Sequence, residues 1–433
     1  MSDRFFLCAL ALLASACLPP LAIGAPCVVD DDCSTPLSCN EGRCFRAAEG
    51  EGDEGEGEGE GEGEGEGEDC VGGTFTLVPA ANRSSVAASS DGTRAGISFS
   101  DADAGGPSGT IFFVVVDPAT GPVGEPVVVD STSGALPAVL ALAWNETTAR
   151  YGVLYAHFQS PSQPQFFFRL IDADGALDGL AHGVTLDSAV FALAGEFSLD
   201  SAHLLPAGDG FDLLYGVRDN DGGVLRGAAV AAVRIAANGS STPPVMAIED
   251  AVLDGVPLIE DDGAVVFGYS QGNTVEDLLR LARLLPTGEL VLLPTSATSA
   301  GVIGTQPLPT STGLFVLYAD QGAGGDKVRP AAGGAEIDIG VNLGDYASTL
   351  SVVRSGDAVV LANANVGGNE VFTARLDPLT GLSQTQVITP SHTLLSLGVA
   401  AVGAGDVVVY TRDRGTPVDD LFVGTDVRVL CQP

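Results

Sequence analysis

The sequence predicts an all-β fold, a seven-bladed β-propeller, for the part of the chain that extends from residue 70 to residue 433. Three observations predict it. From Gly72 onward, short apolar runs alternate with turns rich in Gly, Pro, Asp and Asn, and helix patterns nearly vanish. One strand pattern recurs seven times, with starts separated by about 44 to 60 residues, which is the spacing of propeller blades. Cys70 and Cys431 flank the whole repeated region.

The recurring strand is the element on which the repeat depends. Its copies are RAGISFSD from Arg94, YGVLYAHF from Tyr151, FDLLYGVRD from Phe211, GAVVFGYSQ from Gly263, GLFVLYADQ from Gly313, DAVVLANAN from Asp357 and DVVVYTRDR from Asp406. A polar loop follows each copy, and usually a further strand such as GTIFFVVVD, PQFFFRLID, AAVAAVRIA, LLRLARLL or EVFTARLD. A short apolar strand precedes it, as in AVLALAW, AHLLPA, GVPLI and LGVAAV. Each unit is therefore predicted to hold three or four strands.

Tight turns end the later strand in most units. They are DPATG (117–121), DADG (172–175), AANG (236–239), LPTG (285–288) and DPLTG (377–381). A glycine in the last place fits the left-handed residue that closes a hairpin turn with a bulge. The fifth unit departs from this pattern at KVRPAAGGAEIDIG, where we expect an irregular blade.

The two ends of the repeated region are expected to meet. Stacking the sheets radially covers their faces, and closing the ring removes a long exposed edge. Residues 74–78 (TFTLV) form a strand without a unit of their own, and the seventh unit, which ends at DVRVLC, is predicted to use it. Cys70 and Cys431 would then be neighbours that can form a disulfide. The spacing also fits six or eight blades, and a pair of β-sandwiches stays open as an alternative.

The turn at residues 89–93 (SSDGT) supports the propeller by resemblance. It resembles the S-x-DG-T turn of TolB and WD40-like propellers, and it is clear in the first unit only. The resemblance implies the fold and no particular ligand.

Residues 1–16 are predicted to be a secretory signal peptide. Arg4 precedes an apolar run from Phe5 to Ala16, which is too short to span a bilayer. The segment ASAC resembles a bacterial lipobox, which implies a lipid on Cys17, although Leu13 lies one place too early. Ordinary cleavage near residue 24 is the alternative. We therefore expect an exported protein, either an outer-membrane lipoprotein of the cell envelope or an extracellular protein, that touches a membrane only through this anchor.

A cysteine-rich module is predicted at residues 25–46. Its cysteines lie in the segment CVVDDDCSTPLSCNEGRC, which is too short to bury a core and needs covalent links. With the flanking pair they make six cysteines and suggest three disulfides. The six are Cys27, Cys33, Cys39, Cys44, Cys70 and Cys431. The segment resembles the Dickkopf-type N-terminal cysteine-rich module. Zinc is the alternative, but paired C-x2-C knuckles are missing.

Residues 47–69 are an acidic linker of alternating Glu and Gly, which has no apolar face and is expected to be an extended, disordered stalk. The formal charge of the chain is −37. So strong an acidic balance argues against nucleic acid or an anionic membrane surface as a partner.

Catalytic motifs are missing from the sequence, so we leave the chemistry uncertain and favour a protein that is not an enzyme. The four histidines stand alone, and no G-x-S-x-G elbow or P-loop occurs. No metal site is predicted. Calcium has two weak candidates, the acidic loops DADG (172–175) with Asp178 and DNDG (219–222), for which hairpin turns are the simpler explanation.

The loops after the repeated strands are polar, and in a propeller they share one face. This ring is the predicted binding surface: Asp101, Asp103, His157, Asp219, Asp221, Asn273, Asp320, Asn365, Arg412 and Asp413. Its expected ligand is a protein, a peptide or a glycan, and the expected state is a monomer. The function predicted is a non-catalytic binding or scaffold protein, with a carbohydrate-active propeller hydrolase or lyase as the alternative, although the S-x-D-x-G-x-T-W boxes of sialidases are missing.

Overall fold

The computed structural model shows a ring of sheets for the repeated region and a small hairpin near the N-terminus. The structure describes residues 37–40, 43–46, 73–81, 85–102, 108–159, 164–186, 197–221, 224–271, 276–320, 325–339, 350–364, 370–388, 394–403, 405–413 and 423–431. The chain divides into two compact units, Met1–Glu66 and Gly67–Pro433. Among the described residues, no helix has the length and apolar character needed to cross a membrane.

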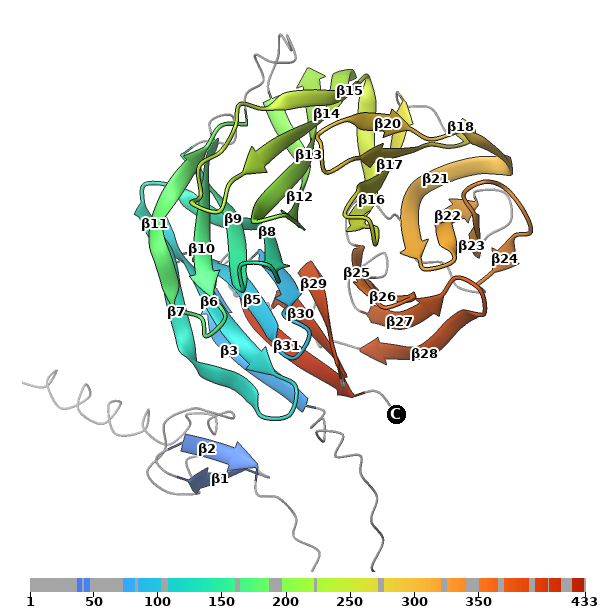
Figure 1. The fold of residues 1–433 in the computed structure, drawn as a ribbon. Helices are drawn as coiled ribbons and strands as arrows, with labels where there is room; N and C mark the ends of the chain where they lie inside the picture. The colour runs from blue at the N-terminus through green and yellow to red at the C-terminus, as the bar shows by residue number, and fades with distance from the viewer. Residues whose placement is uncertain are drawn as a thin grey trace, which may run out of the picture. The chain divides into compact units, whose positions relative to one another are not determined.

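Seven sheets follow one another around a central axis and form the blades of a propeller (Figure 1). Blade 1 comprises β4 (Val86–Ser90), β5 (Ala95–Ala102), β6 (Ser108–Asp117) and β7 (Gly121–Ser133). Blade 2 comprises β8 (Leu136–Asn145), β9 (Arg150–Phe158), β10 (Pro164–Asp172) and β11 (Leu177–Val184). Blade 3 comprises β12 (Phe197–Ala207), β13 (Gly210–Asp221), β14 (Val224–Ile235) and β15 (Val245–Glu249). The prediction of an all-β seven-bladed propeller is confirmed.

The remaining blades complete the ring. Blade 4 comprises β16 (Ala251–Ile259), β17 (Val265–Gln271), β19 (Leu281–Leu284) and β20 (Leu290–Leu292). Blade 5 comprises β18 (Glu276–Leu279), β21 (Ser296–Thr310), β22 (Gly313–Asp320), β23 (Gly325–Pro330) and β24 (Ile337–Asp338). Blade 6 comprises β25 (Ser351–Ser355), β26 (Ala358–Ala364), β27 (Val371–Asp377) and β28 (Gly381–Ile388). Blade 7 comprises β29 (Leu394–Val402), β30 (Gly405–Asp413), β31 (Val423–Cys431) and β3 (Gly73–Ala81).

The recurring strand of the sequence is the strand that follows the innermost strand in every blade. Its side chains are buried on both faces, as in β9, where all seven residues from Tyr151 to His157 are buried. Such a strand lies between its own neighbours in the sheet and is covered by an adjacent blade on each face. Burial on both faces explains why these segments are nearly continuous apolar runs and do not alternate with polar residues.

Blade 5 differs from the others, and one strand prediction there is wrong. The run LLRLARLL was expected to be a single strand, but the chain splits it into β18 and β19, which belong to different sheets. Leu278 and Leu279 of β18 pair with Ala297 and Ser296 of β21 in blade 5. The chain therefore contributes β18 to blade 5 before it forms β19 and β20, the last two strands of blade 4. The irregular KVRPAAGGAEIDIG segment supplies the short β23 and the two-residue β24.

The ring closes through β3, as the sequence predicts. This strand comes first in the propeller but pairs antiparallel with β31, the last strand, with Gly73 opposite Val429 and Phe75 opposite Val427. Phe75 and Leu77 pack against the core shared by blades 7 and 1. The predicted left-handed glycines are also present, with φ of 85° at Gly121 and 87° at Gly175.

In the first unit, β1 (Leu37–Asn40) pairs antiparallel with β2 (Arg43–Arg46). Cys39 lies opposite Cys44 in this hairpin. The other calls on the leader and the cysteine-rich module, including Cys17, Cys27 and Cys33, lie outside the described residues. So does the Glu-Gly linker.

Candidate binding channel

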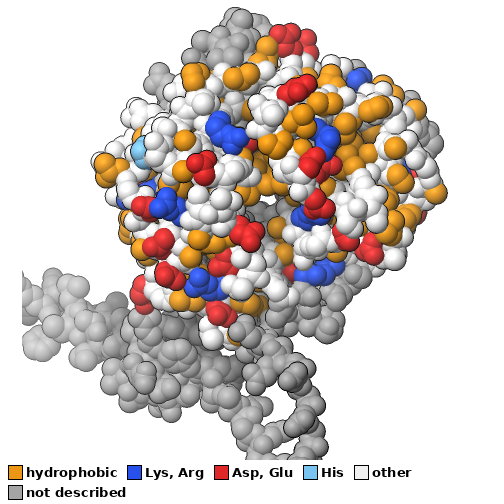
Figure 2. Space-filling view, viewed as in Figure 1, with side chains coloured by type: hydrophobic (Ala, Val, Ile, Leu, Met, Phe, Trp, Pro, Cys, Tyr) orange, Lys and Arg blue, Asp and Glu red, His pale blue; other side chains and the backbone are white. Residues whose placement is uncertain are grey.

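A channel of about 550 Å³ runs along the axis between the innermost strands. It is lined by residues of β4, β8, β12, β16, β25 and β29, the innermost strands of blades 1, 2, 3, 4, 6 and 7. Of the described residues, none from β21 lines it, and β16 contacts β25 in front of blade 5. Figure 2 shows hydrophobic side chains beside the central opening, with acidic and basic side chains distributed around it.

The channel wall is mostly Ala, Val, Leu and Pro. In the part of the chain that the structure describes, its polar lining side chains are Ser89, His203, Glu260, Ser351 and Arg354, and Trp144 adds an indole N–H. Both serine hydroxyls already accept a backbone N–H, Ser89 from Trp144 at 2.9 Å and Ser351 from Val399 at 3.0 Å. The wall is therefore apolar, with few groups that can bind a polar ligand.

Ion pairs occupy one mouth of the channel, at the turn between β16 and β17. Nε of Arg283 pairs with Glu260, and Nη2 of the same guanidinium lies 2.7 Å from Oδ2 of Asp262. The pKa of Asp262 is lowered, first by the backbone N–H of Ala264, which donates to it, and also by Arg283. Burial opposes the charge of Arg283, but its two carboxylate partners raise its pKa. Asp262 is thereby held in its charged form, and the cluster joins one guanidinium to two carboxyl groups.

Arg354 joins blade 6 to blade 4 at the same mouth. Its Nη2 lies 2.6 Å from Oδ1 of Asp261, and its Nη1 donates to the carbonyl of Ile259 at 3.2 Å. Its Nε donates to the carbonyl of Gly356 at 2.9 Å. The guanidinium thus fixes the position of blade 6 relative to β16.

Trp144 and His203 line the channel from neighbouring blades. Trp144 belongs to β8 of blade 2, and His203 belongs to β12 of blade 3. Trp144 is half-buried, and its ring centroid lies 4.7 Å from that of Tyr151. His203 is also half-buried, makes no hydrogen bond or ion pair within the described residues, and has a pKa lowered to about 4 by burial. Its imidazole is therefore neutral near pH 7. The apolar surroundings, together with this pKa, distinguish it from a solvated loop histidine.

The predicted ring of binding residues occupies the opposite end of the propeller. Asp101, Asp219, Asp320 and Asp413 all lie at the carboxyl end of the recurring strand, whereas Glu260 lies just before the start of one. Asp221 is the last residue of β13, and Arg412 is the last residue but one of β30. Asp103, Asn273 and Asn365 lie outside the described residues. The strand ends therefore share one face, and the binding role of that face stays a prediction.

His157 belongs to this set but does not lie in a loop. It is 8% exposed, at the end of β9, and its ring packs 4.9 Å from that of Phe167. Its Nε2 lies 3.5 Å from Oδ2 of Asp130, which also accepts the hydroxyl of Tyr155 at 2.8 Å. Burial lowers the pKa of His157, although Asp130 acts in the opposite direction. The side chain links blades 1 and 2.

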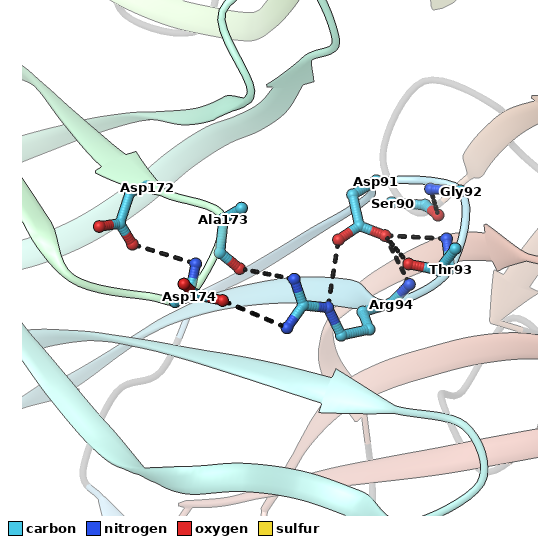
Figure 3. A network of polar contacts seen from close by, with 8 residues as sticks. All are labelled: Ser90, Asp91, Gly92, Thr93, Arg94, Asp172, Ala173 and Asp174. Carbon is cyan, nitrogen blue, oxygen red and sulfur yellow. Dashed lines mark hydrogen bonds and ion pairs between the residues drawn. The ribbon is translucent and has the colours of Figure 1, made fainter.

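The first calcium candidate is a hairpin turn, seen beside the SSDGT turn in Figure 3. Oδ1 of Asp172 accepts the backbone N–H groups of Asp174 and Ala176 at 3.0 and 2.8 Å. Asp174 lies 3.7 Å from Arg94, and Asp178 lies 2.8 Å from Arg150. Among the described residues, no group of three or more His, Cys, Asp or Glu could hold a metal ion. The side chains of Asp219 and Asp221, in the second candidate, lie outside the described part.

No protein-family model matches the chain, and no curated protein matches it. Solved structures are similar to it at low identity. The polysaccharide lyase Uly1 is 11% identical over 86% of this chain and 94% of that chain, with a TM-score of 0.47. Trypanosoma rangeli sialidase with the inhibitor DANA is 10% identical over 70% of this chain and 56% of that chain, with a TM-score of 0.46.

A subtype N10 neuraminidase-like protein of A/little yellow-shouldered bat/Guatemala is 8% identical over 83% of this chain and 98% of that chain, with a TM-score of 0.39. These structures include carbohydrate-active enzymes, the class named by the alternative prediction. At such identities the likeness shows the fold alone, and the residues of the site carry any argument about function.

Proposed function

We propose that the propeller is a non-catalytic binding module whose axial channel receives an apolar group of its ligand. The observation that supports this is the composition of the channel wall. Of the described residues that line it, Glu260 is the only carboxylate, and Arg283 already pairs with it. A preformed apolar cavity with a few polar groups is the usual form of a ligand site.

Glycoside hydrolysis makes demands that this mouth does not meet. It needs two carboxyl groups, one of which is protonated or free to attack. Here Glu260 and Asp262 are paired with Arg283, and Asp261 is paired with Arg354. Sugar hydroxyls that entered the apolar channel would also lose hydration without recovering hydrogen bonds. An apolar group has no hydrogen bonds to water to lose, and burial of its surface in the channel is favourable.

The channel contains its own reporter. Trp144 is the only tryptophan of the chain and lines the cavity. Titrating the mature full-length protein with toluene, a compact apolar probe, is expected to change Trp144 emission saturably. Ala202→Leu narrows the channel and is expected to weaken toluene binding about fivefold or more, because added methylenes occupy the space that the probe would fill.

Ala236→Leu is the matched control, because this exposed alanine lies in the turn after β14 and away from the channel lining. It is expected to leave toluene binding unchanged. If Ala202→Leu destabilises the protein, Ala87→Leu on β4 provides a second narrowing variant. Absence of a saturable change in the wild-type protein, or an equal loss in the Ala236→Leu control, contradicts the proposal.

The carbohydrate-active alternative has a direct assay. The same protein is incubated with a panel of neutral, uronic-acid and sialic-acid polysaccharides, and new reducing ends, unsaturated products and free sialic acid are measured. Turnover that is lost in a Glu260→Gln variant would replace the binding proposal with an enzyme. No product from any member of the panel is the expected result.

We also propose that this module is displayed outside the cell on the Glu-Gly stalk, anchored through a lipid on Cys17. The proposal rests on the leader and linker patterns of residues 1–16 and 47–69. Intact-mass measurement of the exported protein tests it. A diacylated or triacylated N-terminal Cys17 is expected, and a free N-terminus near residue 25 would show ordinary secretion instead.

A further inference from the structure

Among the described side chains that line the channel, His203 is the one that offers a hydrogen-bond acceptor and makes no hydrogen bond or ion pair to a described residue. It lies on β12 between Ala202 and Leu204, with Leu214 opposite it on β13. The serine, glutamate and arginine side chains of the lining are engaged: Ser89 and Ser351 accept backbone N–H groups, and Glu260 and Arg354 belong to ion pairs. The indole of Trp144 can only donate. His203 makes no hydrogen bond or ion pair within the described residues.

An uncharged imidazole offers one N–H donor and one nitrogen acceptor. An unpaired polar group in an apolar wall favours a ligand that supplies its hydrogen bond, because a ligand without such a group would displace water from the imidazole and leave it unsatisfied. Such a wall also disfavours charged ligands, since a desolvated ion would meet a single neutral partner. The ion pairs at the mouth join two arginines to three carboxyl groups, and each of these carboxyl groups already has an arginine partner.

On these grounds we infer that His203 is the recognition residue of the channel, and that the group bound there is an uncharged apolar body carrying one hydroxyl or amide that hydrogen-bonds to the imidazole. The inference rests on the proposed binding function and specifies its ligand class. It excludes cationic and anionic groups as the inserted part of the ligand.

Four probes of nearly one shape test the inference: toluene, benzyl alcohol, benzylammonium and benzoate. Their dissociation constants are measured on the mature full-length protein from Trp144 emission, with ligand-observed NMR as a second readout. Benzyl alcohol is expected to bind at least about tenfold more tightly than either ion.

The variants His203→Leu and His203→Gln isolate the hydrogen bond. In His203→Leu, the ratio of the toluene to the benzyl alcohol dissociation constant is expected to fall about fivefold, because one hydrogen bond is lost from the alcohol alone. Toluene itself is expected to bind His203→Leu as tightly as it binds the wild type, or more tightly. His203→Gln, which keeps a donor and an acceptor, is expected to recover part of the ratio.

The outcomes separate this inference from the proposed function. If none of the probes binds the wild type, the channel is not an apolar site and both fail. If toluene binds but the ratio is the same in His203→Leu, the function stands and the role of His203 is overturned. Tighter binding of either ion than of the alcohol also overturns it.

Discussion

At the scale of single residues, contacts between blades depend on glycines in the recurring strands. A Cβ added to Gly96 of β5 would lie 2.5 Å from Cε1 of Tyr151 in the next blade. At Gly152 of β9, a Cβ would lie 2.7 Å from Cε2 of Phe168 and 2.9 Å from Cζ of Phe211 in blade 3. Since the aromatic rings are fully buried, they have little room to move away.

The first prediction follows from this packing. Gly152→Ala is expected to lower the free energy of unfolding by about 1–3 kcal/mol, because the added methyl group overpacks the contact between blades 2 and 3. The measurement is urea denaturation followed by circular dichroism. Gly183→Ala is the matched control, because nothing lies within 4 Å of a Cβ at that position. An equal effect of the two substitutions would show that close packing is not the cause.

At the scale of elements, the turn from Ser90 to Arg94 joins two blades. Oδ1 of Asp91 accepts the backbone N–H groups of Thr93 and Arg94 at 2.8 and 2.6 Å. Arg94 in turn donates to the carbonyl of Ala173 at 3.1 Å, in the C-terminal hairpin of blade 2 (Figure 3). The turn that resembles those of other propellers therefore also serves as a contact between blades.

Asp91→Ala is expected to cost about 1–3 kcal/mol at pH 7, since it removes the acceptor of the exposed Thr93 N–H and the partly buried Arg94 N–H and the ion pair with Arg94. Asp117→Ala removes a comparable turn acceptor in the same blade. Asp117 accepts the N–H of Ala119 at 2.7 Å and makes no hydrogen bond or ion pair to another blade among the described residues. We expect the Asp117 variant to lose less stability. Chemical denaturation of both variants, side by side, measures the difference.

The cost of Asp91→Ala is also expected to depend on pH. Burial opposes ionisation of Asp91, but the N–H groups of Arg94 and Thr93 outweigh it and lower its pKa below 3.8. A lowered carboxyl pKa gives stability that is present above the unfolded value and is lost as pH falls through the folded value. The stability difference between wild type and variant should therefore shrink below about pH 4. A constant difference from pH 7 to pH 3 would contradict this.

At the scale of the whole molecule, the first strand of the propeller completes its last blade. β3 pairs with β31, and Phe75 lies close to Gly121 of blade 1, where a Cβ would be 2.7 Å from the ring. Cys70 lies outside the described residues, three positions before the start of β3, and β31 ends at Cys431, so the Cys70–Cys431 bridge stays a prediction.

Removing β3 is expected to open the ring. A chain that starts at Gly67 should unfold at the same denaturant concentration as the mature protein, whereas a chain that starts at Ser85 should lose about 2–5 kcal/mol, mainly through the exposure of β31 and the loss of Phe75 and Leu77. The Gly67 chain with Cys70→Ala and Cys431→Ala separates the effect of the strand from that of a disulfide. Equal stability of the Ser85 chain would contradict closure by β3.

The sequence predicted the architecture well because its signals are local and repeated. The seven copies of one strand, the glycine turns at 121 and 175, and the closing strand at 74–78 all follow from patterns within a few residues. It mispredicted LLRLARLL, because an apolar run looks the same whether it enters one sheet or is divided between two. It also grouped His157 with the polar loops, since a histidine that follows an apolar strand carries no sign of being packed against another blade.

By itself, then, the sequence determined the fold class, the order of the blades and the way the ring closes, because periodic strands and turns express their structure without reference to distant residues. Only the tertiary structure decided which side chains line the channel and which carboxylates are engaged. Arg354 and Asp261, or Arg283 and Glu260, meet because blades converge on an axis, and convergence depends on the packing of whole sheets. The environment of His203, which has no hydrogen-bond partner among the described residues, depends on tertiary structure for the same reason, since it is built from strands far apart in the chain.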